Sequence, residues 1–167
     1  MNIVQERLFA HRYASTLTDL LRELAADPES LEAMQECYPA LWDDLADNGF
    51  ACLDIEHYRQ SFEIFQFLVD HQPHDASFQA GLADSQSGLK HYLEAAAAYE
   101  ETIRQAPDIP EAYVYLAEIY MMLAQHEHAQ PLLEEVMRMT EGGFEHPMRS
   151  AAERLMAFVR EATQAPN

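Results

Sequence analysis

Lysine is almost absent from this chain of 167 residues, in which Lys90 is the only one. Ten basic residues stand against 29 acidic ones, so the formal net charge is −19 at pH 7. A surface this acidic repels phosphates and anionic lipid headgroups, which argues against nucleic acid and charged membrane surfaces as partners. Basic or strongly hydrophobic partners are favoured instead.

Cysteine, glycine and long apolar runs are also scarce. Cys37 and Cys52 form neither a disulfide framework nor a CxxC pair, so we expect a reducing, cytoplasmic compartment. Five glycines and eight prolines exclude collagen-like and low-complexity chains. No apolar run approaches the roughly 20 residues of a membrane span, and residues 1–16 lack the pattern of a secretory signal. We therefore expect a soluble protein without membrane insertion.

Signatures of catalysis and of cofactor binding are missing too. The sequence has no Gly-rich phosphate loop, Walker motif or GxSxG elbow. The closest histidine pairs, His71 with His74 and His126 with His128, are accompanied by neither an HExxH helix nor a Cys/His cluster. Neighbouring carboxylates are typical of solvated helix faces. We expect no enzyme activity, no metal and no cofactor.

A period of 34 residues relates three segments, which begin at Trp42, Ala76 and Pro110. The shared places hold small residues where two helices touch and large ones in the next groove, which is the tetratricopeptide pattern. The small residues are Gly49, Ala83 and Ala117 at the eighth place and Ser61, Ala95 and Ala129 at the twentieth; the large ones at the twenty-fourth are Phe65, Tyr99 and Leu133.

This period predicts an all-α tetratricopeptide-repeat solenoid of three helical hairpins with flanking helices at both ends. The prolines between units end one hairpin and begin the next. The expected repeat helices are about 42–54, 57–70, 76–88, 91–105, 110–123 and 126–140, with flanking helices near 29–37 and 147–162. The expected division is an N-terminal helical region over 1–41, repeats over 42–75, 76–109 and 110–143, and a capping helix with tail over 144–167.

The first helix of each repeat is expected to line a concave groove at its second, fifth, ninth and twelfth places. None of these places is basic, which disfavours the clamp that binds heat-shock-protein tails. An extended peptide could place apolar side chains in pockets and basic or N–H groups on Asp84 and Glu118. The twelve places are Asp43, Ala46, Phe50, Leu53, Ser77, Ala80, Asp84, Ser87, Glu111, Val114, Glu118 and Met121.

Several motifs in the first two repeats carry a family resemblance. They are Phe65-Gln66-Phe67-Leu68, His74-Asp75, Gly81-Leu82-Ala83, Gln86, Tyr92, Ala95 and Tyr99. With these motifs the chain resembles the class II type III secretion chaperones, the SycD/LcrH/IpgC-like tetratricopeptide family. It departs from their G-L-G at Ala83 and from their G-x-Y-x-x-A at Lys90.

The resemblance implies a non-catalytic bacterial cytoplasmic chaperone that keeps hydrophobic, secreted translocator proteins soluble and unassembled before export. An extended client segment would lie in the groove on Ala46, Phe50, Leu53, Ala80, Asp84, Ser87, Val114, Glu118 and Met121. N-terminal helices of the family form dimers, so a homodimer is possible here, with Leu17, Leu20, Leu21 and Leu24 as candidates. Alternatively, that leucine stripe packs on the first repeat.

The competing function is a tetratricopeptide scaffold or adaptor in another bacterial assembly, such as a pilus or a regulatory complex.

Overall fold

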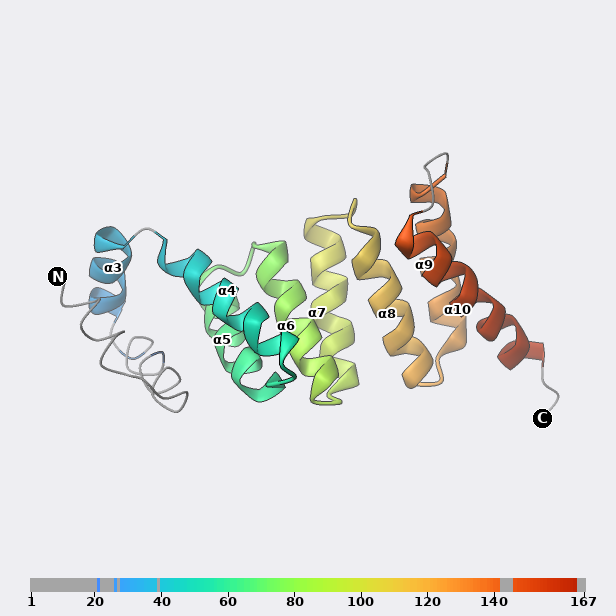
Figure 1. Ribbon diagram of the computed structural model, residues 1–167, viewed down its shortest axis with the longest axis horizontal. Coiled ribbons are helices and arrows are strands. Elements are labelled where there is room, and N and C mark those ends of the chain that lie inside the picture. Colours follow the sequence, from blue (N-terminus) through green and yellow to red (C-terminus); the bar gives the residue numbers. More distant parts are fainter. Residues whose placement is uncertain (1–20, 22–25, 27, 39, 142–145, 165–167) are drawn as a thin grey trace.

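A computed structural model describes residues 21, 26, 28–38, 40–141 and 146–164. Within these ranges all regular elements are α-helices, and they follow one another along an elongated solenoid (Figure 1). The helices are α3 (Pro28–Cys37), α4 (Leu41–Asp54), α5 (Tyr58–His71), α6 (Ala76–Gly88), α7 (Tyr92–Gln105), α8 (Pro110–Met122), α9 (His126–Met139) and α10 (Pro147–Gln164).

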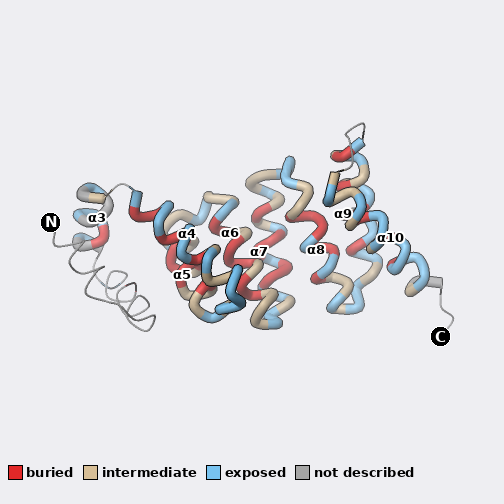
Figure 2. Tube along the Cα trace, viewed as in Figure 1, coloured by how far each residue is buried: buried red, intermediate tan, exposed pale blue. Residues whose placement is uncertain are grey.

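The all-α solenoid expected from the 34-residue period is confirmed. Each of the six repeat helices begins and ends within one residue of its expected place. Buried residues run along the middle of the solenoid from α4 to α10, where consecutive helices meet (Figure 2). The helix α10 lies at the C-terminal end of the solenoid. It packs Ala152, Met156 and Val159 against the third repeat, as expected of a capping helix.

The N-terminal leucine stripe is only partly within the described residues. Leu21 is buried in one cluster with Leu31, Leu41 and Trp42, so this side chain packs against the helices that follow it. Leu17, Leu20 and Leu24 lie outside the described residues. Dimerisation through the stripe stays a prediction.

One turn geometry recurs in all three hairpins. The residue at the fifteenth place of each repeat (Glu56, Lys90 and Ala124) has a left-handed φ between 57° and 64°. The amide of the next residue donates to the carbonyl five positions earlier, at 2.8–2.9 Å, which is the bond of a Schellman cap. The left-handed conformation normally favours glycine, and no repeat has glycine there. The caps therefore form at a conformational cost.

The first and second repeats are joined by the ring of Phe65, a fully buried residue of α5. Gly49 of α4 and Gly81 of α6 face this ring from two sides. A Cβ atom would lie 2.7 Å from the ring at Gly49 and 2.3 Å from it at Gly81. Both distances are shorter than any ordinary contact between carbon atoms. The two glycines therefore let three helices approach a single aromatic side chain.

Replacing Gly81 by alanine tests this close approach. The added methyl group must displace the Phe65 ring, and we expect the free energy of unfolding to fall by roughly 1–3 kcal/mol, despite the better helix propensity of alanine. Urea unfolding followed by circular dichroism measures the change. In the double variant Gly81→Ala/Phe65→Leu the loss should be smaller than the sum of the single losses. Additive losses would contradict the proposed clash.

Replacing Lys90 by glycine tests the cost of the left-handed turns. The left-handed conformation costs a residue with a side chain about 1–2 kcal/mol. Glycine avoids this cost, but its larger loss of entropy on folding destabilises the folded state by roughly 0.5–1 kcal/mol. We expect Lys90→Gly to be more stable than the wild type by up to about 1 kcal/mol in urea unfolding. Lys90→Ala controls for loss of the charged side chain, and equal stability of the two variants would refute the strain.

Candidate functional site

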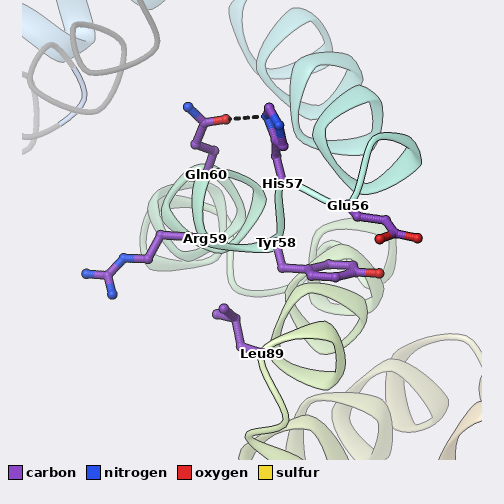
Figure 3. A pocket seen from close by; sticks show the side chains of 6 residues that line it. All are labelled: Glu56, His57, Tyr58, Arg59, Gln60 and Leu89. Atoms are coloured by element: carbon purple, nitrogen blue, oxygen red, sulfur yellow. Dashed lines mark hydrogen bonds between the residues drawn. The ribbon is translucent and has the colours of Figure 1, made fainter.

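A hollow of about 470 Å³ opens at the turn between α4 and α5, beside the end of α6 (Figure 3). Its charged Arg59 is paired with Glu63 at 3.4 Å, and the Nδ1 atom of His57 lies 3.0 Å from Oε1 of Gln60. Among the described residues that line it are one tyrosine, Tyr58, and no serine, threonine or cysteine. Within this described lining, His57 therefore has no serine, threonine or cysteine beside it to activate as a nucleophile.

A second hollow, of about 240 Å³, lies between the second and third repeats. It brings together Asp84, Ser87 and Glu118, three of the residues expected to line the groove. The complete lining comes from α6, α7 and α8: Asp84, Ser87, Tyr92, Tyr99, Tyr115, Glu118, Ile119 and Met122. We call this cavity the tyrosine pocket. It is the part of the expected groove where the structure shows a partly open cavity.

The tyrosine pocket is electrically negative. The described residues that line it include two carboxylates and no basic side chain. The Tyr99 hydroxyl donates a hydrogen bond to Oδ1 of Asp84. Burial raises the pKa of Asp84, and this hydrogen bond partly opposes the rise. Burial also raises the pKa of Glu118. Burial therefore makes the ionised forms of both carboxyl groups less favourable, and a positive group in the pocket would stabilise them.

Two of the tyrosines that line the pocket, Tyr99 and Tyr115, have a raised pKa. Burial and then the charge of Asp84 raise the pKa of Tyr99. The pKa of Tyr115 is raised by burial and by the carboxylates of Asp84 and Glu118. Both hydroxyls therefore remain protonated at neutral pH, and the rings present neutral aromatic faces with hydroxyl donors.

The expected groove residues of the first repeat belong largely to the core. Ala46 is buried in the cluster around Phe65, and Phe50 and Leu53 are half-buried against the same cluster. The ring centroids of Phe50 and Phe65 lie 4.8 Å apart in an edge-on contact. Phe50 and Leu53 thus keep part of their surface exposed, while Ala46, which is 7% exposed, has little surface left for a ligand.

In the third repeat the exposed residues differ from those expected. Val114 is buried and Met121 is half-buried, both in the core cluster of that repeat, whereas Met122 is 68% exposed and Tyr115 39% exposed. Tyr115, Glu118 and Met122 follow the i, i+3, i+7 spacing of one helix face, a signal that the sequence contained. Ala80 of the second repeat is half-buried.

Other chemistry has little support in the residues that the structure describes. No three His, Cys, Asp or Glu side chains gather there as metal ligands. Burial raises the pKa of Cys52, so its thiol is less reactive than an exposed one. In the same ranges, no helix combines the length and apolar character of a membrane span.

Comparison with known proteins places the fold. Neither a family model nor a curated protein matches the sequence, but many solved structures are similar to the fold of this chain. The Yersinia enterocolitica type III secretion chaperone SycD, solved with a peptide of the translocator YopD, is 15% identical, with a TM-score of 0.67 over 73% of this chain and 94% of SycD. PcrH, solved with the chaperone-binding region of PopD, is 20% identical, with a TM-score of 0.63 over 72% and 90%.

A third neighbour is the first tetratricopeptide domain of Spaghetti (RPAP3) bound to the HSP90 peptide SRMEEVD. It is 15% identical, with a TM-score of 0.66 over 74% of this chain and 94% of that domain. The fold is that of the tetratricopeptide repeat. The resemblance to SycD and PcrH agrees with the family suggested by the sequence motifs, and at these identities it establishes the architecture.

Replacing Asp84 by asparagine tests whether folding raises the pKa of this carboxyl group. A carboxyl whose pKa is raised by folding contributes stability below its unfolded pKa, and that contribution is lost as the pH rises through the folded value. We therefore expect the stability of Asp84→Asn relative to the wild type to increase from pH 4 to pH 7. Urea unfolding at several pH values measures this difference. A flat or falling difference would contradict a raised pKa at Asp84.

Proposed function

We propose that this chain is a cytoplasmic chaperone of type III secretion translocator proteins, which binds an extended segment of a hydrophobic client and keeps the client soluble before export. The client segment lies along the face formed by α4, α6 and α8, over the groove residues predicted from the sequence, together with Tyr115 and Met122. The observation that carries the proposal is the tyrosine pocket, a partly open and partly apolar cavity on this face.

The surface of α8 suits an unfolded apolar segment. Met122 and Tyr115 are large, exposed and beside the pocket. A flexible thioether adapts to varied apolar side chains, and tyrosine combines an apolar ring with a polar end. The net charge of −19 keeps such a complex dispersed while the client is covered. A chaperone of hydrophobic proteins needs both the apolar binding surface and the net charge that keeps the complex dispersed.

The charge of the pocket separates this function from the binding of heat-shock-protein tails. The HSP90 peptide held by Spaghetti, SRMEEVD, has three acidic residues and one basic residue. Within the part of the chain that the structure describes, the tyrosine pocket presents Asp84 and Glu118 and no basic side chain, so an acidic tail would be repelled. SycD and PcrH, in contrast, were solved with segments of the proteins YopD and PopD. A translocator segment is therefore the occupant that we favour.

Capture of the natural partner tests the class of function. We expect the tagged protein, purified from its native host, to carry a hydrophobic secreted protein in stoichiometric amount. That protein should precipitate when it is expressed without this chain. Capture of folded cytoplasmic or envelope subunits would instead support a scaffold in another assembly.

Substitution of Met122 by glutamate tests the location of the binding surface. A carboxylate at this place removes apolar contact, and we expect the captured client to bind about tenfold more weakly, a change of about 1.4 kcal/mol. Fluorescence anisotropy with a labelled client segment measures the affinity. Phe158→Glu is the matched control, because Phe158 is a large apolar residue of α10, 54% exposed and outside the pocket. Equal losses in both variants would place the surface elsewhere.

A further inference from the structure

We propose that the tyrosine pocket receives the side chain of one lysine or arginine of the bound client segment, so that the chaperone selects a basic residue among apolar ones. This inference rests on the proposed function, because the basic residue is delivered by the same segment.

Aromatic rings form much of the wall. Tyr92 and Tyr99 come from α7 and Tyr115 comes from α8, so rings of two helices meet at one cavity. The ring centroids of Tyr99 and Tyr115 lie 6.0 Å apart. An ammonium or guanidinium group within about 6 Å of an aromatic face is attracted by the negative face of the ring. Aromatic walls around a negatively charged cavity are the usual surroundings of a bound organic cation.

The carboxylates of the pocket have unused capacity. Asp84 accepts one hydrogen bond, from Tyr99, and a carboxylate can accept several. Within the described residues, the Glu118 carboxylate has no hydrogen-bond or ion-pair partner. Among the described residues, no Lys or Arg lines the cavity. Asp84 is half-buried and Glu118 is exposed at the mouth of the cavity, and a cation supplied by the client would offset the electrostatic cost of holding the two carboxylates close together.

The size of the cavity suits a single side chain. The pocket has a volume of about 240 Å³, which leaves room for one long side chain. Ile119 and Met122 complete the lining with apolar atoms, against which the methylene stem of lysine or arginine can pack. An extended segment that passes over the pocket can thus insert a single long cationic side chain.

A peptide library tests the pocket directly. The probes are acetylated nonapeptide amides rich in leucine and valine, in which each position in turn holds lysine, arginine, norleucine or glutamate. Norleucine has the apolar stem of lysine without its charge. We expect one position at which lysine or arginine binds about tenfold more tightly than norleucine, with glutamate weakest. In Glu118→Gln this preference should fall toward unity, whereas Glu127→Gln, an exposed change on α9, should retain it.

The outcomes distinguish this inference from the proposed function. If the apolar peptides bind but no position prefers a basic residue, the cation pocket is refuted and the proposed function stands. A basic preference that survives both Glu118→Gln and Asp84→Asn places the cation at another surface, which also refutes the pocket. If none of the apolar peptides binds, the proposed groove and the pocket fail together.

Discussion

The fold depends first on one contact, the ring of Phe65 between the glycines of two neighbouring repeats. Repeats of this kind cannot bury their apolar faces alone and are stabilised by their neighbours. Gly49 and Gly81 have no Cβ, so α4 and α6 both reach the Phe65 ring of α5. This contact sets α4 and α6 side by side, and α8 follows in the next hairpin. The face that carries the proposed site is a consequence of that stacking.

The 34-residue period predicted the architecture well, because proline breaks, small residues at helix contacts and large residues in the grooves all agree. It predicted the exposed surface less well. Place counting assigns the same role to every repeat, yet Val114 is buried in the core cluster of the third repeat and Met122 is exposed instead of Met121. Neighbouring residues on a helix differ by about 100° in direction, so Met121 and Met122 cannot both face the core of the repeat. Only the packing of α8 against its neighbours decides which of the two is exposed.

The site itself could be predicted in part. Counting places identified Asp84, Ser87 and Glu118, which the structure brings to one cavity. It missed the tyrosines of the wall, because Tyr92 and Tyr99 belong to the second helix of their repeat and approach the groove only through the packing of α7 beside α8. The hydrogen bond from Tyr99 to Asp84 joins two residues 15 positions apart. A list of positions on first helices could not contain it.

In the proposed function, an acidic surface, exposed apolar residues on α8 and a negative cavity form one binding face. This face binds an extended hydrophobic segment that contains a basic residue. The most direct test is photo-crosslinking in the intact complex with the captured client, with p-benzoylphenylalanine replacing Met122 in one protein and Phe158 in another. The account predicts a crosslink to a single short client segment from position 122 and none from position 158. Crosslinks from position 158 alone would contradict it.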